Sequence, residues 1–418
     1  MSLTYLSSKS VLQFMDPNLR IKFRQRCPGI RSIEKTIPMR IDEVQLTPTM
    51  IRINKKTYRL CLYECYRESP DKMPEGIRNV RKMSRERDHD VDHYGIRDQP
   101  EATIRFIERL RKDLDIEHSK DMYYKAKQLL SIEKNPVEMK ALEERINHYG
   151  SIYYPYLLRE EETPRYRMPY FYCIKLIVGD DKTEMVEYSK TLGDALKYLV
   201  GQLFGTARSI AIRVLEINPT APFHYSMPYN LSVCNLKITE QAEKALDAFN
   251  FSCPLQKLEI MTHNHEIFDF RNRIIRKTAI YSNPVVRDTE VLIVNGVFLS
   301  EDLQQILNRR VLFSKPHRGS TMSRVLPDIV KTWRRDTPVI GTHFEFNMEE
   351  HFWDDAFFDD IEYLPGARKG ISKIYQNVDL REFYVRDLLR RGWLFASVPR
   401  TRLECLFWPF TLSSVILS

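Results

Sequence analysis

Hydrophobic positions in the first forty residues recur at the spacing of short helices. Ser7 or Ser8 can cap the first helix, and Asp16 followed by Pro17 is typical of the first turn of a second. Pro28 disfavours helical backbone at the residue before it, so the second helix is expected to end there. Helices this short bury little by themselves and need the rest of the chain or a partner. The pattern predicts three helices, with apolar positions at Val11, Leu12, Met15, Leu19, Phe23, Ile30 and Ile33.

The next stretch changes from helical spacing to alternation. Residues 50–53 and 58–63 alternate apolar and polar side chains on either side of Asn54, which predicts a β-hairpin. Residues 67–101 are polar and rich in turn-forming residues, so they predict a long loop.

Helical spacing returns in residues 101–150, where Asn135-Pro136 interrupts the pattern, so at least two helices are expected. Two interpretations are open. The helices are either an insertion that packs on its own domain or a coiled coil that binds a partner, and few heptads are sustained for the latter. The apolar positions are Ile104, Ile107, Leu110, Leu114, Met139, Leu142, Ile146 and Tyr149.

Strands and helices alternate from Tyr170 onward. Residues 170–178 and 183–188 predict paired strands, and residues 192–203 predict a helix. Five short strands follow, at 214–217, 235–238, 257–260, 291–294 and 310–313. Helices are expected between some of them, at 242–249 and 301–307.

The leading apolar positions of these five strands recur every 19 to 34 residues. Leucine-rich repeats have units of about 20–29 residues, so a curved, mainly parallel sheet with helices on its outer face is expected. The regular asparagine of such repeats is missing, and the likeness is one of architecture. We expect residues 170–313 to fold as one layered strand–helix unit.

Together these patterns predict an α+β protein. Its expected segments are a small helical motif at residues 1–40, a β-hairpin and polar loop at 41–100, a helical insertion at 101–168, and an irregular leucine-rich-repeat-like strand–helix region at 169–418.

Composition narrows the class of protein without naming an activity. Hydrophobic residues are 43% and charged residues 29%, within ordinary globular limits, and the net charge of +8 is spread along the chain. The basic run at 78–87 is followed by acidic residues, which favours a solvated loop over a phosphate-binding patch, so no nucleic-acid partner is expected. The seven cysteines have no close paired spacing and no signal peptide is recognised, so a cytoplasmic or nuclear location is expected.

No segment reaches the roughly 20 apolar residues that span a bilayer, so no membrane contact is expected. The segment at 405–418, which has no charged residue, comes closest to that length. It contains Pro409. Its length and the proline favour a docked terminal segment over a membrane anchor.

No arrangement of residues predicts an active site. Nucleophile motifs, phosphate-binding loops and paired Cys-x-x-Cys motifs are absent. His263 and His265 would share one face of a strand, which a metal could use, but no further ligand is evident nearby and surface histidines are the simpler interpretation. We therefore expect no catalytic residue, no cofactor and no bound metal, and the protein is not expected to be an enzyme.

Short motifs that follow one another along the chain carry a resemblance to a known family. They are Arg26-Cys27-Pro28, residues 33–40, Leu142-Glu143-Glu144-Arg145, residues 169–176, and Trp333 followed by residues 340–346. With these motifs the chain resembles the large nematode family of F-box-like proteins with an F-box-associated region. The resemblance implies that residues 1–40 are an F-box-like motif, which docks onto the Skp adaptor of a cullin ubiquitin ligase. It implies a substrate-recruiting adaptor that acts by protein–protein binding.

The expected contacts with a Skp-like adaptor are apolar side chains of the first two helices: Leu6, Val11, Leu12, Met15 and Leu19. Leu6-Ser7 stands where the family usually has Leu-Pro, and Ile30 replaces the aromatic residue that commonly follows the cysteine. These departures keep open an alternative, a binding or scaffold protein on the same fold that no longer joins a ligase. An enzyme with a dispersed site is a third hypothesis, disfavoured by the lack of any motif.

The target of such an adaptor is expected to bind far from the docking helices. An acidic run beside aromatic residues near the end of the chain could contact a basic partner, through Asp354, Asp355, Phe357, Asp359 and Asp360. The alternative is that the aromatic rings lie in the core and the acidic residues form a solvated helix face. The sequence does not name the target.

Overall fold

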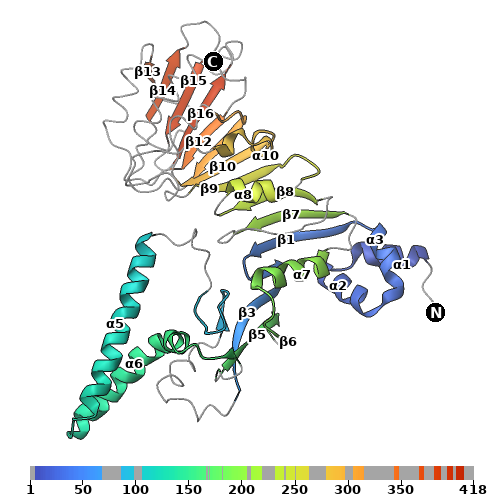
Figure 1. The fold of residues 1–418 in the computed structure, drawn as a ribbon. Coiled ribbons are helices and arrows are strands. Elements are labelled where there is room, and N and C mark those ends of the chain that lie inside the picture. Colours follow the sequence, from blue (N-terminus) through green and yellow to red (C-terminus); the bar gives the residue numbers. More distant parts are fainter. Residues whose placement is uncertain are drawn as a thin grey trace. The chain divides into compact units, whose positions relative to one another are not determined.

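The structure is a computed structural model, and it describes residues 5–67, 86–97, 106–165, 168, 170–180, 182–204, 209–218, 231–239, 242–249, 251–262, 279–296, 305–314, 343–347, 367–370, 381–386, 393–398 and 402–408. Helices and strands are both present, as expected for a mixed α/β protein (Figure 1). The chain divides into two compact units. Unit 1 consists of Met1–Pro48, Arg52–Lys55 and Val200–Ser418, and unit 2 of Thr49–Ile51 and Lys56–Leu199.

Unit 1 begins with the predicted short helices. They are α1 (Tyr5–Phe14), α2 (Pro17–Arg26) and α3 (Arg31–Thr36), with a 3-10 turn η1 (Pro28–Ile30) before α3. The Asp16 side chain accepts hydrogen bonds from the backbone N–H groups of Asn18 and Leu19, at 2.9 and 3.2 Å. Pro17 occupies the first turn, and α2 ends at Arg26, just before Cys27-Pro28. The predicted helices and the start and stop signals of α2 are therefore confirmed.

A run of neighbouring parallel strands forms the sheet of unit 1. In spatial order these strands are β1 (Met39–Thr47), β7 (Ile210–Ile217), β8 (Leu231–Ile238), β9 (Lys257–Thr262), β10 (Val291–Gly296), β11 (Arg310–Ser314) and β12 (His343–Asn347). Antiparallel strands continue the sheet beyond β12: β16 (Arg402–Trp408), β15 (Trp393–Val398), β14 (Arg381–Arg386) and β13 (Ala367–Gly370). The five short strands predicted from the sequence are β7 to β11, and their positions and parallel order are confirmed.

The core of this sheet consists of two columns of aliphatic and aromatic side chains, because parallel strands in register align every second residue. One column is Val44, Leu215, Leu236, Leu258, Leu292 and Val311, and the other is Leu46, Ile217, Ile238, Ile260, Val294 and Phe313. All twelve side chains are buried. Strand β1 supplies the first member of each column, Val44 and Leu46.

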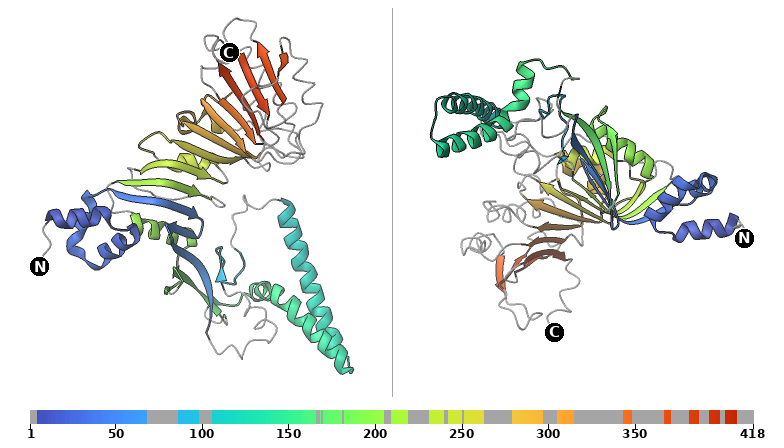
Figure 2. Two further views of the ribbon diagram at one scale, coloured as in Figure 1. Left: turned by 180° about the vertical axis from the view of Figure 1, so that it is seen from behind. Right: turned by 90° about the horizontal axis from the view of Figure 1, so that it is seen from below.

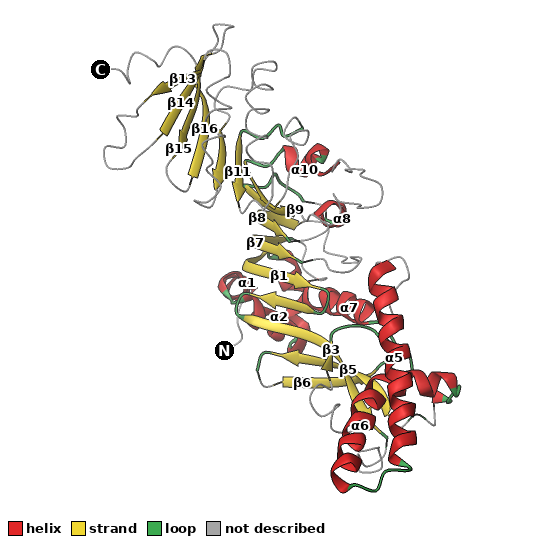
Figure 3. Ribbon diagram, turned by 90° about the vertical axis from the view of Figure 1, so that its left-hand side faces the viewer, coloured by secondary structure: helices red, strands yellow, loops and turns green. Residues whose placement is uncertain are grey.

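Short helices connect some of the parallel strands. The helix α8 (Ala242–Ala248) follows β8, and η5 (Ala279–Ser282) and α10 (Pro284–Arg287) precede β10. Both α8 and α10 lie along the same side of the strands (Figure 3). The helix predicted at 242–249 is confirmed, whereas most of the one predicted at 301–307 lies outside the described residues.

Unit 2 contains an antiparallel sheet and a long helical hairpin. Its strands are β3 (Lys56–Tyr66), β5 (Tyr170–Val178) and β6 (Lys182–Glu187), in that spatial order, and the short β4 (Glu86–Arg87) pairs with β3. The strand β2 (Met50–Ile53) and the helix α7 (Leu192–Phe204) each contribute residues to both units. The turn between β2 and β3 places Asn54 at φ 54°, a left-handed conformation that asparagine tolerates well.

The predicted helices of the insertion are α5 (Phe106–Leu130) and α6 (Pro136–Glu160). They lie side by side as a hairpin (Figures 1 and 2). Asn135 caps α6, because its side chain accepts a hydrogen bond from the N–H of Val137 at 3.0 Å. Two helices broken at Asn135-Pro136 are therefore confirmed.

The expectation that residues 170–313 form one unit is wrong at its start. Strands β5 and β6 pair with each other as predicted, but β5 also pairs along its whole length with β3, from Tyr58↔Val178 to Tyr66↔Tyr170. This long-range pairing places β5, β6 and most of α7 in unit 2. Periodicity identified the strands but carried no information about this distant partner.

No helix among the described residues is long and apolar enough to cross a bilayer.

Candidate functional site

Large apolar side chains lie exposed on the first two helices. Phe14 is 84% exposed and Leu6 72% exposed, which is unusual for such residues. We call this group the N-terminal patch, and its members are Tyr5, Leu6, Val11, Phe14 and Leu19. The five residues share their exposure and their place in α1 and α2, and exposed apolar side chains at one end of a protein are candidates for contact with another protein.

The structure changes the set of residues expected to contact a Skp-like adaptor. Leu6, Val11 and Leu19 are exposed, and Met15 is half-exposed. Leu12 is only 1% exposed, so it belongs to the core of the N-terminal helices and its assignment to a partner surface is corrected. Helical spacing showed that α1 has an apolar side, but it could not show that Leu12 turns toward the protein itself, where α1 packs against α3.

Tyr5 and Phe14 were missed by the sequence reasoning. Both are large apolar residues at the two ends of α1, Tyr5 two turns before Leu12 and Phe14 one turn after Val11. Their signal was available, because both lie within the segment predicted as a small helical motif and add to its apolar positions.

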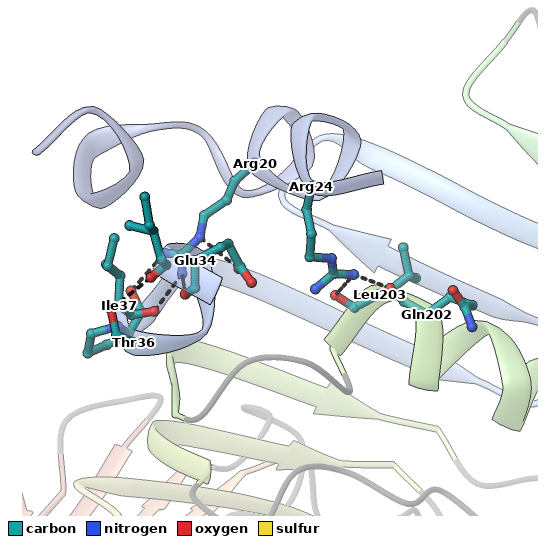
Figure 4. Close-up of polar contacts among 9 residues, drawn as sticks. Arg20, Arg24, Glu34, Thr36, Ile37, Gln202 and Leu203 are labelled. Atoms are coloured by element: carbon teal, nitrogen blue, oxygen red, sulfur yellow. Dashed lines mark hydrogen bonds and ion pairs between the residues drawn. The ribbon is translucent and has the colours of Figure 1, made fainter. Parts of the chain in front are cut away.

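Charged residues occupy the buried side of α2, where apolar residues are normally found. Arg20 is 2% exposed and Glu34 of α3 is fully buried. Arg20 Nε donates a hydrogen bond to Glu34 Oε1 at 3.0 Å, and its Nη atoms donate to the backbone carbonyls of Glu34, Ile37 and Pro38 (Figure 4). The planar guanidinium thus joins α2 to α3 and to the segment that enters β1.

Burial lowers the pKa of the Arg20 guanidinium, and the neighbouring Glu34 carboxylate opposes that shift. Arginine remains charged nonetheless, so α2 and α3 are held by a desolvated ion pair. The second carboxylate oxygen, Glu34 Oε2, is buried and has no hydrogen-bond partner among the described residues.

Arg24 lies one helical turn after Arg20 on the same side of α2. Its guanidinium donates to the backbone carbonyls of Gln202 and Leu203 at the end of α7, the latter at 3.4 Å (Figure 4). The last carbonyls of a helix have no partner within the helix and carry partial negative charge. Arg24 therefore caps the C-terminal end of α7, and burial lowers the pKa of its guanidinium.

Asn18 adds a further buried link, because its side-chain Nδ2 donates to the carbonyl of Ile53 at 3.0 Å. Polar contacts thus tie α2 to α3, to β2 and to the end of α7, all within unit 1. The N-terminal helices form a platform that buried polar contacts and the buried side chains of Leu12 and Ile21 fix to unit 1, and the residues of the N-terminal patch lie exposed on it.

The titratable residues of unit 2 form pairs that hold strands and loops together. Glu64 is buried beside Arg87, at 3.5 Å, and accepts a hydrogen bond from Tyr172 at 3.1 Å. Glu86 accepts from Lys175 at 2.7 Å, and this bond lowers the pKa of Glu86. These groups tie the 86–97 segment to β3 and β5, which accounts for the burial of Glu64 in structural terms.

The residues expected to contact a target, Asp354, Asp355, Phe357, Asp359 and Asp360, lie outside the described residues, as do His263 and His265. Within the parts of the chain that the structure describes, no cluster of three or more histidine, cysteine, aspartate or glutamate side chains could hold a metal ion.

Comparison with known proteins gives one match. Residues 191–350 are similar to a family described as a domain of unknown function, DUF3557. The matched stretch runs from α7 through the parallel strands β7 to β12. No curated protein and no solved structure matched the chain.

Proposed function

We propose that this protein is a substrate-recruiting adaptor of a Skp–cullin–F-box ubiquitin ligase, which acts by protein–protein binding and catalyses no reaction itself. The observation that carries the proposal is the N-terminal patch on helices that are fastened to unit 1 by buried polar contacts. It is supported by the F-box-like resemblance of residues 1–40. The adaptor works in the cytoplasm or nucleus.

The patch suits a mainly apolar contact with a Skp-like partner. Burial of apolar surface contributes about 25 cal/mol per Å², and Phe14 and Leu6 expose most of their side chains. Because the platform is already fixed by Arg20 and Arg24, little ordering has to accompany binding, which favours affinity.

The strand–helix region binds the target protein in this proposal. In this proposal the parallel strands β7 to β12 are an irregular leucine-rich-repeat-like layer of an F-box-associated region. The acidic residues Asp354, Asp355, Asp359 and Asp360 beside Phe357 remain the proposed contact for a basic target.

Co-purification of the full chain with a Skp-like adaptor, detected by mass spectrometry, tests the proposal. Leu6→Asp with Phe14→Asp places two charges in the patch, at positions exposed enough to leave the fold intact, and should abolish the association. Val137→Asp is the matched control, because Val137 is 76% exposed but lies in α6 of the hairpin. Equal recovery of the adaptor with wild type and the double variant would reject this interface.

The alternative function is a binding or scaffold protein on the same fold that no longer joins a ligase. Leu6-Ser7 in place of Leu-Pro, and Ile30 in place of an aromatic residue, favour it. The same experiment separates the two functions. A wild-type chain that recovers other proteins through unit 1, but never a Skp-like adaptor, is a scaffold and not a ligase subunit.

A further inference from the structure

Two cysteines on neighbouring strands of unit 2 bring their sulfur atoms into contact. Cys65 lies near the end of β3, and Cys173 lies in β5, 108 residues later. Their Sγ atoms are 3.8 Å apart. The strand register pairs Cys65 with Phe171 and Cys173 with Tyr63, so the two cysteines are diagonal neighbours on one face of the sheet.

This face is partly open. Cys65 and Cys173 are both half-buried, and cationic side chains lie over the adjacent rings, Arg67 over Phe171 at 5.3 Å and Lys175 over Tyr63 at 5.0 Å. Both cysteine residues therefore keep part of their surface open to solvent.

Cys61, on the same strand and the same side, differs. It is buried, its thiol donates toward the carbonyl of Lys175 at 3.9 Å, and burial raises the pKa of its thiol. A buried thiol of this kind is expected to be inert. The structure describes the side chains of six cysteines, and among these the sulfur atoms of Cys65 and Cys173 are the pair in contact.

We propose that Cys65 and Cys173 form a reversible cross-strand disulfide, so that unit 2 carries a thiol modification site. A disulfide has a sulfur–sulfur bond of about 2.05 Å. The sulfur atoms start at 3.8 Å. Diagonal neighbours on paired strands lie about 7–8 Å apart, which is at the limit for a disulfide, so bond formation requires rotation about χ1 together with a small approach of the two strands.

The oxidant is a peroxide, and the step balances. One thiolate attacks an oxygen of hydrogen peroxide, the O–O bond breaks, and the departing hydroxide takes a proton to become water. The second sulfur then attacks the resulting sulfenic sulfur, the S–O bond breaks, and a second water leaves. Two thiols lose two electrons and two protons in total, and a small thiol such as glutathione reverses the bond by exchange.

The bond has a mechanical consequence, because it joins the ends of a 108-residue stretch that contains the whole α5–α6 hairpin. A cross-link that closes a loop of this length restricts the unfolded chain strongly. The oxidised form of unit 2 is therefore the more stable one, with β3 and β5 locked together.

Peptide mapping of the purified full chain tests the site. The chain is treated with hydrogen peroxide, alkylated and digested without reduction. We expect a linked peptide pair that contains Cys65 and Cys173 and separates on addition of dithiothreitol. Cys65→Ser and Cys173→Ser should each abolish the pair, whereas Cys253→Ser, a half-buried cysteine of unit 1, should retain it.

Thermal melting followed by circular dichroism gives an independent readout. Oxidation should raise the melting temperature of the wild type by about 5 °C or more, and Cys65→Ser should lose this rise. Recovery of both cysteines as thiols or as sulfinic acids, without a linked peptide, would overturn the proposal. So would a linked form that melts no higher than the reduced chain.

Discussion

The N-terminal helices and the α5–α6 hairpin arrange the same kinds of residue in opposite ways. In the N-terminal helices the ion pair is inside, with Arg20 and Glu34 at 3.0 Å and 2% and 0% exposed. In the hairpin the ion pair is outside, with Lys120 and Glu160 at 2.8 Å and 41% and 49% exposed. The interatomic distances are nearly the same, so the difference between the two pairs is the solvent around them.

The aromatic residues show the reverse arrangement. Tyr153 is buried between the helices of the hairpin, whereas Phe14 of α1 is exposed. Among the described side chains, the hairpin buries Ala126, Leu142, Tyr153 and Leu158, but it also leaves Tyr124, Leu129, Ile132, Val137 and Ile152 exposed. The N-terminal helices depart from the usual amphipathic rule at particular positions, because Arg20, Arg24 and Glu34 are buried beside Leu12 and Ile21, whereas Phe14 and Leu6 are exposed. The docking proposed above would cover these exposed side chains.

Breaking the inner ion pair should have the largest effect. Arg20→Met leaves Glu34 buried without its counter-ion, and loss of one partner of a buried pair costs about 3–5 kcal/mol of unfolding free energy. Tryptophan fluorescence in urea measures it in unit 1, because Trp333, Trp353, Trp393 and Trp408 all belong to that unit.

A second variant shows whether the charge itself is responsible. Arg20→Met combined with Glu34→Leu removes both charges and should recover most of the lost stability. If the double variant were as unstable as the single one, the backbone hydrogen bonds of Arg20, and not its ion pair, would account for the effect.

The next largest effect on the unfolding free energy is expected at the buried one of two leucines in α1. Leu12→Ala removes a buried side chain and should cost about 2–5 kcal/mol. Leu6→Ala changes an exposed side chain and should stay within about 0.5 kcal/mol of wild type. The same urea titration compares them, and similar losses at both positions would contradict the assignment of Leu12 to the core and Leu6 to the patch.

Tyr153→Phe should have a moderate effect in the hairpin. The change removes the hydrogen bond from the Tyr153 hydroxyl to Glu160 Oε2, at 2.5 Å, but keeps the buried ring. A hydrogen bond of this kind contributes about 1 kcal/mol. Circular dichroism at the helical band follows the loss, and a cost like that of a core truncation would mean that the ring had also moved.

Lys120→Ala should have the smallest effect, because both charges of this pair are open to solvent. Two hydrogen bonds lower the pKa of Glu160: the larger contribution comes from Lys120 and the smaller from Tyr153. A lowered carboxyl pKa contributes stability above the unfolded value of about 4.3, and this stability is lost as the pH falls through the folded value. Hairpin stability measured across that acid range should therefore decline less steeply in Lys120→Ala than in wild type.

Much of the fold was predictable because its elements carry local signals. The Asp16-Pro17 cap, the break at Asn135-Pro136 and the alternation in β7 to β11 each depend on residues close together in the chain. The pairing of β1 with β7 and of β3 with β5 depends on residues more than one hundred positions apart, and no periodicity encodes it.

The candidate site was predictable only in part for the same reason. The predicted helices near the N-terminus contain Leu6, Val11 and Leu19, which are exposed. Whether the Leu12 side chain is buried depends on where α3 packs. The buried positions of Arg20 and Arg24 were unpredictable, because the carbonyls that hold them belong to Ile37, Pro38, Gln202 and Leu203. In the sequence, the apolar face expected for α2 is that of Leu19 and Phe23, whereas Leu19 is exposed and Arg20 and Arg24 are buried.

Calorimetric titration of the full chain with a purified Skp-like adaptor tests the central claim most directly. The claim is that the N-terminal patch is a docking surface. Wild type should bind, Phe14→Asp should weaken the dissociation constant by tenfold or more, about 1.4 kcal/mol, and Val137→Asp should bind like wild type. Equal affinities for wild type and Phe14→Asp, or no binding of the wild type at all, would contradict the claim.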